Sequence, residues 1–289
     1  MINWQAISFY LLYPFIYLIA SLPFWLLYRV SDFFYFLLNL SGYRKQVVVE
    51  NLRNSFPEKS EEEIQAIRRK FFRYLVDLIF ETLKTLRMNE KESAAGCTMD
   101  NPPWLQQLYE QKRSILIVMG HYGNWEWAGP SVTLNTKYQL VVIYRPLTNP
   151  YFEKMMVGMR TRFGTMITPV PQTLRDMVAK RSLITATAFI ADQYPPAEGK
   201  IWLDFLNQDT GFFTGPEKLS TKFDYPIVYI QVKRQKRGHY HITPELLFEH
   251  PKQTQEGEIT RTFAKRLEQD IQAQPETWLW SHKRWKHKR

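Results

Sequence analysis

Short apolar runs that alternate with segments of helical pattern constrain the fold of this chain more than any other feature. Runs of this kind are typical of buried strands. They comprise Ile115–Met119, Gln139–Tyr144 and Leu183–Ile190, followed by an expected hairpin of Pro226–Val232 and His239–Ile242. Segments between them, such as Thr173–Ala179, have the spacing of helices. The alternation predicts an α/β fold with a mostly parallel central sheet flanked by helices.

The segment Met1–Tyr28 carries no charged side chain and is rich in aromatic residues. A helix needs about 20 apolar residues to cross a bilayer, so the length permits a span. Pro14 and Pro23 argue against one straight helix, and aromatic side chains favour the boundary between lipid and water. A second apolar run, Phe33–Leu38, is too short to span and suits an interfacial helix. We therefore expect membrane attachment through this end of the chain.

The expected organisation is a membrane anchor over residues 1–40 and a single domain over residues 41–289. Arg29, Arg44 and Lys45 follow the first apolar segment and no Lys or Arg precedes it, which predicts that the rest of the chain lies in the cytoplasm. A secretory signal peptide is disfavoured, because the segment has neither a basic start nor a small-residue cleavage site. The remaining alternative is a buried helix pair of the main domain.

Residues 44–90 read as helices. Ser60 and Glu63 have the spacing of a capping box, in which a hydroxyl and a carboxylate each accept a backbone amide at a helix start. Apolar residues recur behind them at helical spacing, which predicts a long amphipathic helix.

Composition excludes several classes of protein and site. The mean hydropathy of −0.36 excludes a polytopic membrane protein, and the single Cys excludes a disulfide scaffold or a Cys-rich metal site. His239 and His241 share one face of an expected strand but lack further ligands at metal-binding spacing. Neither a phosphate-binding nor a dinucleotide-binding glycine loop occurs. We expect no metal and no bound cofactor.

The segment Gly120–Glu126 carries the most informative chemistry. His121 follows an expected strand and therefore lies at the carboxyl edge of the sheet, where open α/β sheets bind ligands. Glu126 would fall in the first turn of the next helix, and a turn at Gly123 can bring it to His121. A carboxylate on one imidazole nitrogen leaves the other as a base. The alternative is a buried His that is hydrogen-bonded near a helix start.

Five motifs, in this order, resemble those of the bacterial lipid A biosynthesis (late, lauroyl/myristoyl) acyltransferase family. They are Gly120–Glu126, Tyr144–Pro146 with Asn149–Pro150, Asp192–Gln193, Phe212–Gly215 and Trp278–Lys286. The resemblance covers nearly the whole chain and implies a glycerolipid-acyltransferase-like fold. It also implies an inner-membrane enzyme whose cytoplasmic active site moves a fatty acyl group from acyl-carrier protein to a hydroxyl of a lipid A precursor.

The resemblance implies roles for individual residues. His121 matches the general base and Glu126 its orienting carboxylate, and Asp192 matches a second important acid. Arg160 matches a cation that binds phosphate or polarises the thioester, and Arg162 competes for that role. Arg145 is a further substrate-binding candidate. The structural alternatives are a helix or turn cap for Asp192 and a solvated loop cation for Arg145.

Two segments, Tyr194–Lys200 and Trp202–Leu206, depart from the family pattern and leave acyl-chain length and acceptor identity open. Reaction type is not affected. The remaining alternatives are an acyltransferase for another glycerolipid or glycolipid, and a catalytically inactive membrane-bound interaction protein.

The C-terminal end is basic and rich in Trp. Trp278, Trp280 and Trp285 alternate with Lys and Arg, a pattern that suits contact with anionic lipid headgroups. A basic face would also attract the acidic acyl-carrier protein. Nucleic-acid binding is the rival interpretation of the charge, but no zinc, RNP-like or helix–turn–helix pattern supports it. The expected partners are acyl-carrier protein, a lipid A precursor and membrane lipids.

Overall fold

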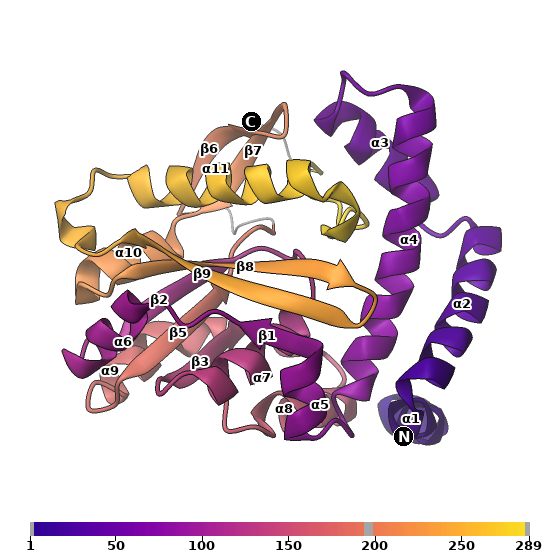
Figure 1. The fold of residues 1–289 in the computed structure, drawn as a ribbon, viewed down its shortest axis with the longest axis horizontal. Helices are drawn as coiled ribbons and strands as arrows, with labels where there is room; N and C mark the ends of the chain where they lie inside the picture. Colours follow the sequence, from indigo (N-terminus) through magenta and orange to yellow (C-terminus); the bar gives the residue numbers. More distant parts are fainter. Residues whose placement is uncertain (1–2, 194–198, 287–289) are drawn as a thin grey trace.

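A computed structural model describes residues 3–193 and 199–286 (Figure 1). In this part of the chain, seven strands form one sheet in the order β1-β9-β8-β2-β5-β3-β4, and β6 and β7 form a separate hairpin. The sheet strands are β1 Cys97–Met99, β2 Ile115–Met119, β3 Gln139–Tyr144, β4 Met166–Pro169, β5 Thr185–Ile190, β8 Ile227–Lys236 and β9 His239–Phe248. Neighbours are parallel except for the antiparallel pair β8–β9. The predicted α/β fold with a mostly parallel sheet is confirmed.

Helices cover both faces of the sheet. Side chains of β2 alternate between two hydrophobic cores, because successive residues of a strand point to opposite faces. Leu116 and Val118 lie in the core that includes α11 Glu258–Ala273. Ile117 and Met119 lie in the core under α6 Pro103–Glu110 and α7 Trp125–Asn135. Every residue of β2 is buried, as a strand covered on both faces requires.

The pattern of the sequence located the five longer strands of the main sheet and missed the shorter ones. The strands over Ile115–Met119 and Gln139–Tyr144 were predicted with the bounds that the structure has, and so was the helix α9 Thr173–Ala179. Both strands of the hairpin begin about where expected and extend further at their carboxyl ends, β8 to Lys236 and β9 to Phe248. The sequence pattern does not predict β1 and β4, which have only three and four residues. It also does not predict the hairpin β6 Lys200–Phe205 with β7 Gln208–Phe213, in which polar residues interrupt the apolar pattern.

The first four helices form a group beside the sheet. They are α1 Trp4–Ser21, α2 Phe24–Ser41, α3 Lys45–Ser55 and α4 Glu61–Lys84. Helix α4 stands between the sheet and α2 (Figure 1). It begins with the predicted capping box, in which Ser60 accepts the amide of Glu63 and Glu63 accepts the amide of Ser60.

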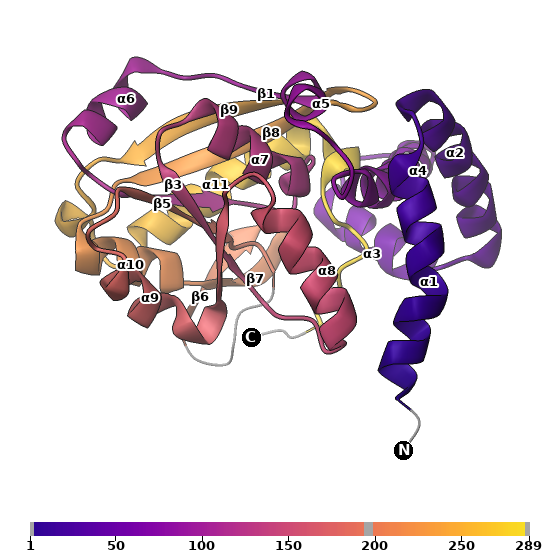
Figure 2. The ribbon, with the colours of Figure 1, turned by 90° about the horizontal axis from the view of Figure 1, so that it is seen from below.

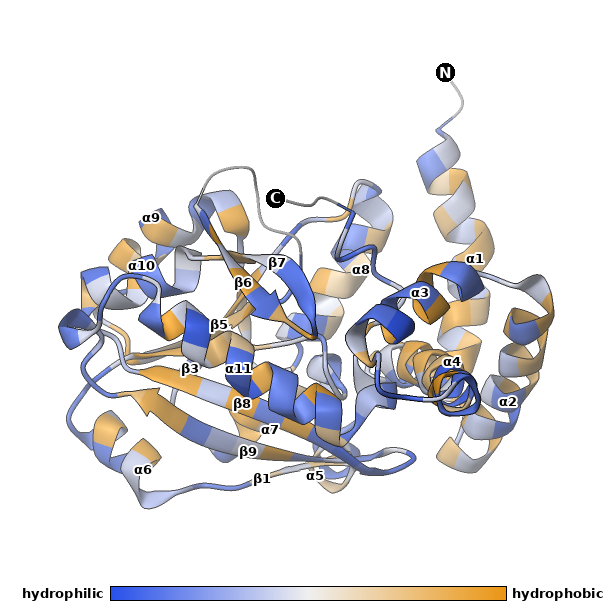
Figure 3. Ribbon diagram, turned by 90° about the horizontal axis from the view of Figure 1, so that it is seen from above, coloured by the Kyte–Doolittle hydropathy of each residue, from blue (hydrophilic) through white to orange (hydrophobic). Residues whose placement is uncertain are grey.

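Helix α1 projects from the rest of the molecule, as Figure 2 shows. It has 18 residues with a hydropathy of 1.3 and only 6% of them buried, so by length and composition it could cross a membrane. The apolar residues along it are visible in Figure 3. The helix continues through Pro14, whereas the chain breaks before Pro23, the N-cap of α2. The apolar segment is therefore not one straight helix, as its two prolines predicted.

Helix α2 is fastened to α4 by polar contacts. The Ser31 hydroxyl donates to Asp77 at 2.7 Å, and Arg237 from the β8–β9 turn bridges Asp32 and Asp77. Residues of the expected anchor thus form part of the folded body, whereas α1 contributes one buried residue, Ala20. The domain boundary at residue 40 stays a prediction.

The remaining elements are short and connect the larger ones. They are α5 Glu90–Gly96, α8 Pro150–Thr161, α10 Gly215–Phe223 and the 3-10 turns η1 Val170–Gln172, η2 Pro251–Gln253 and η3 Pro275–Thr277.

Candidate active site

The register of two parallel strands brings His121 and Asp192 together. Met119, the last residue of β2, pairs with Ile190, the last residue of β5. Each strand continues by two residues to one of these side chains, so both reach the carboxyl edge of the sheet at the same level. A side chain at Gly120 would crowd this junction, because a Cβ there would lie 2.6 Å from a terminal methyl carbon of Leu267, which would have to shift.

The carboxylate of Asp192 holds the His121 ring in a fixed orientation. Asp192 Oδ1 lies 2.6 Å from His121 Nδ1, and Oδ2 accepts the backbone amide of His121 at 2.8 Å. The indole N–H of Trp278 donates to the same Oδ2 at 2.8 Å. Burial alone would raise the pKa of Asp192, but the His121 ring and these hydrogen bonds outweigh it and the pKa lies below its usual value. A buried carboxylate in this position keeps the proton of the imidazole on Nδ1.

The other ring nitrogen, Nε2, is the one available for chemistry. With Nδ1 as donor, Nε2 carries a lone pair, and the side-chain amide of Gln193 lies 3.3 Å from it. The Trp125 ring packs edge-on against the imidazole at 4.9 Å between centroids. The side chain of His121 keeps 17% exposure, so the ring is not closed off from solvent.

The partner predicted for His121 is wrong. Glu126, in the first turn of α7, binds Arg160 of α8 through two hydrogen bonds, from Nε at 3.1 Å and from Nη2 at 2.6 Å. The carboxylate on the imidazole comes from Asp192, 71 residues away in the sequence. A local turn at Gly123 therefore does not decide the pairing; the adjacency of β2 and β5 does.

The three arginines of the prediction lie in different surroundings. Arg160 is held by Glu126 and is partly buried. Arg162 donates to the backbone carbonyls of Thr85 and Leu86, at the carboxyl end of α4, where a cation stabilises the helix. Arg145 is exposed in the loop after β3. The structure thus places Arg160 beside the predicted acid and gives Arg162 a structural contact.

The C-terminal segment lies in the interior, which corrects its predicted role as a lipid-contacting cluster. Trp278 and Trp280 are 3% and 0% exposed, and their rings meet at 4.7 Å. Arg284 is also buried and donates to the Gly211 carbonyl. Lys283 and Lys286 remain exposed, and Lys288 and Arg289 lie outside the described residues. Trp278 was not recognised as a site residue, although its motif was identified.

The loop after β2 is fixed from two sides. From the C-terminal segment, the amide of Leu279 donates to the His121 carbonyl at 3.2 Å, and the Gly123 amide donates to Thr277. From α4, the Tyr74 hydroxyl donates to the Gly123 carbonyl at 2.5 Å. Gly123 has a φ of +60°, and a Cβ there would lie 1.8 Å from the Val232 carbonyl oxygen, so only glycine fits.

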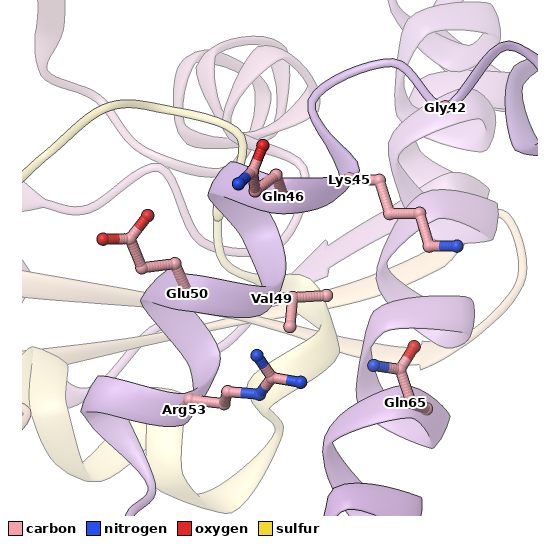
Figure 4. Close-up of a pocket in the computed structure, with 7 residues that line it drawn as sticks. All are labelled: Gly42, Lys45, Gln46, Val49, Glu50, Arg53 and Gln65. Carbon is pink, nitrogen blue, oxygen red and sulfur yellow. The ribbon is translucent and has the colours of Figure 1, made fainter.

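A groove between α3 and α4 lacks the features of a substrate site. Figure 4 shows this open groove, which has a volume of about 550 Å³. Lys45 and Glu50 place charges of both signs on its wall, and Arg53 is paired with Glu61. The groove does not include His121, Asp192 or Glu126.

Comparison with known proteins agrees with the geometry. No curated protein matches the chain. A family model described as bacterial lipid A biosynthesis acyltransferase matches residues 3–287. Because the match spans nearly the whole chain, including both strands of the candidate site and the C-terminal Trp segment, this protein belongs to the bacterial lipid A biosynthesis acyltransferase family.

Proposed function

We propose that this lipid A acyltransferase moves a fatty acyl group from the thioester of acyl-carrier protein to a hydroxyl of a lipid A precursor, with His121 as the general base. The observation that carries the proposal is the His121–Asp192 pair at the carboxyl edge of the sheet, in a chain of this family. The described site residues offer an oriented base, and the nucleophile arrives with the lipid.

The proposed step balances without a cofactor. His121 Nε2 accepts the proton of the lipid hydroxyl while the hydroxyl oxygen attacks the carbonyl carbon of the thioester. The tetrahedral intermediate collapses, the carbon–sulfur bond breaks, and the imidazolium returns its proton to the departing thiolate. The products are an ester and the free thiol of the carrier. A positioned base of this kind contributes roughly 10²–10⁴-fold to the rate.

Two carboxylates divide the supporting work in this proposal. Asp192 keeps the imidazole in its reactive tautomer and stabilises the imidazolium. Glu126 holds the guanidinium of Arg160 at two points, and this cation binds a lipid phosphate or stabilises the oxyanion of the intermediate. The exposed Arg145 is proposed to bind substrate at the outer edge of the site.

The proposed location is the cytoplasmic face of the inner membrane. Trp4, Leu11 and Phe15 of α1 are 71%, 66% and 65% exposed, and an uncovered apolar helix of this kind is stabilised by lipid. The basic residues that follow α1 favour a cytoplasmic position for the body of the protein.

The test uses purified protein in detergent with labelled acyl-carrier protein thioester. Label is followed into a lipid A precursor and, in a parallel reaction, into lysophosphatidate. The proposal predicts transfer to the lipid A precursor, and His121→Ala is expected to lower it by roughly 10²–10⁴-fold. Transfer to lysophosphatidate alone would contradict the acceptor, and transfer from an acyl-coenzyme A thioester but not from the carrier would contradict the donor.

A further inference from the structure

A single buried carboxylate joins the N-terminal helices to the loop that carries His121 and Glu126. Glu81 of α4 is 0% exposed. Its Oε1 accepts the hydroxyl of Tyr28 in α2 at 2.9 Å. Its Oε2 accepts the side-chain amide of Asn124 at 2.9 Å and the hydroxyl of Tyr240 in β9 at 2.7 Å. Three separate elements therefore meet at one acid.

Asn124 is placed between the two proposed functional residues of the loop. Its side-chain oxygen accepts the amide of Trp127 at 3.0 Å and so caps α7, the helix in which Glu126 occupies the first turn. The carbonyl of Glu81 also accepts the indole N–H of Trp127 at 3.0 Å. Glu81 thus fixes the start of α7 through both its side chain and its backbone.

A fully buried acid such as Glu81 is unusual, because burial disfavours the charged form of a carboxyl group. Burial raises the pKa of Glu81 to about 7, with Asp77 of the same helix acting in the same direction. Arg234 of β8 and the hydroxyls of Tyr240 and Tyr28 oppose the rise. An ionised carboxylate can accept hydrogen bonds but cannot donate them, and the Glu81 carboxylate accepts from three donors. This arrangement is suited to holding the three donor side chains in place.

We propose that Glu81 is a positioning residue, which holds the His121–Glu126 loop in its reactive geometry through Asn124 and makes that geometry depend on the seating of α2 through Tyr28. The inference rests on the proposed function, in which His121 and Glu126 serve acyl transfer. Loss of either link is expected to lower kcat with little change in KM, since neither Glu81 nor Tyr28 is assigned a contact with substrate.

The link to the loop is tested by exchanging donor and acceptor. Asn124→Asp keeps the cap of α7 but sets a second carboxylate against Glu81, and kcat is expected to fall about tenfold to a hundredfold. The double variant Glu81→Gln with Asn124→Asp restores a donor facing an acceptor and is expected to recover most of that loss. A double variant no faster than Asn124→Asp, with both folded by circular dichroism, overturns this link.

The link to α2 is tested by a double-mutant cycle with a matched control. Tyr28→Phe removes the hydroxyl on Glu81, and Ser31→Ala removes another hydrogen bond between α2 and α4 that does not involve Glu81. Each is combined with Asn124→Ser, which keeps a capping hydroxyl but loses the contact with Glu81. The effects of Tyr28→Phe and Asn124→Ser on kcat are expected to depart from additivity by more than about twofold. The effects of Ser31→Ala and Asn124→Ser on kcat are expected to be independent, so that their factors multiply in the double variant. Independent effects in both cycles would overturn the inference.

Hydrogen exchange of the peptide covering residues 121–127 gives a second readout that does not depend on the reaction. Tyr28→Phe and Asn124→Ser are expected to accelerate exchange in this peptide, and Ser31→Ala is expected to leave it unchanged. Exchange at the wild-type rate in all three variants contradicts the inference, whether or not the protein transfers acyl groups. A wild-type protein that transfers no acyl group would instead reject the proposed function.

Discussion

Helix α1 and the C-terminal segment from Trp278 to Trp285 are both rich in aromatic side chains, although only the C-terminal segment also carries Lys and Arg. Their surroundings are opposite. Trp4 at the start of α1 is 71% exposed, whereas Trp280 is fully buried. The sequence suggested contact with lipid for both segments, and the structure leaves only α1 open to it.

The difference lies in hydrogen bonding as well as in burial. The indole N–H groups of Trp278, Trp280 and Trp285 donate to Asp192, the Pro275 carbonyl and Thr210 respectively. A buried indole needs such a partner, and here one of the partners is the acid that orients His121. Aromatic richness therefore does not by itself distinguish a membrane anchor from a wall of an active site.

The largest expected effect concerns His121, which the buried C-terminal segment contacts. His121→Ala should lower acyl transfer by roughly 10²–10⁴-fold, the usual contribution of a positioned base, and should leave the protein in the membrane fraction because α1 is untouched. Turnover with labelled thioester and sedimentation with membranes measure the two properties. Transfer at the wild-type rate would remove His121 from the mechanism.

A matched pair of Trp substitutions sharpens the comparison. Trp278→Phe removes a hydrogen bond to the buried Asp192 carboxylate, and a bond to a charged group is worth about 1.5–3 kcal/mol, so kcat is expected to fall tenfold or more. Trp25→Phe, at a position that is 70% exposed in α2, is expected to leave kcat unchanged in detergent. Equal losses in both variants would contradict an active-site role for the C-terminal segment.

The proposed contact of the exposed helix α1 with lipid is tested by placing charges on this helix. Leu11→Asp and Phe15→Asp should each weaken binding to lipid vesicles about tenfold or more, because burial of such a side chain contributes about 1.5–3 kcal/mol. Gln107→Asp, at an exposed position of α6, serves as a control of equal charge. Vesicle flotation measures binding. Unchanged binding of both α1 variants would show that other surfaces suffice.

The smallest expected effect concerns the pH dependence of stability in the C-terminal segment. Burial, helped by the charges of Arg284 and Arg44, lowers the pKa of His282, and Asp192 opposes the change. The folded state then binds the proton more weakly than the unfolded state, so the free energy of unfolding should decrease as pH falls below about 6.5.

Urea unfolding between pH 7.5 and 5.5 measures this effect as the difference between the wild type and His282→Gln. The slope of the difference cannot exceed about 1.4 kcal/mol per pH unit for one proton. Parallel curves for the two proteins would contradict the assignment to His282.

Much of the sheet was readable because apolar runs mark buried strands directly. The strand Ile115–Met119 and the capping box at Ser60 needed only local pattern. The order of the strands did not follow from the sequence: β3 comes between β2 and β5 along the chain, yet β5 lies between β2 and β3 in the sheet.

The same limit explains which site residues were paired correctly. His121 and Asp192 were both selected, but their contact depends on the β2–β5 adjacency. Glu126 was assigned to His121 because the two are near in sequence, whereas its partner Arg160 lies on the separate helix α8. The burial of Trp278 depends on packing against Phe205 of β6 and against Trp280 and Trp285, and the contact with the distant strand β6 is one that no local pattern encodes.

The proposed reaction depends most directly on the orientation of the His121 imidazole by Asp192. The decisive measurement is the single-turnover rate of acyl transfer from labelled acyl-carrier protein to a lipid A precursor by Asp192→Asn, in protein shown to be folded. An amide in place of the carboxylate favours the wrong tautomer and no longer stabilises the imidazolium. We therefore predict a rate that is lower by a factor of about 10² or more. A variant that transfers the acyl group at the wild-type rate would contradict the account.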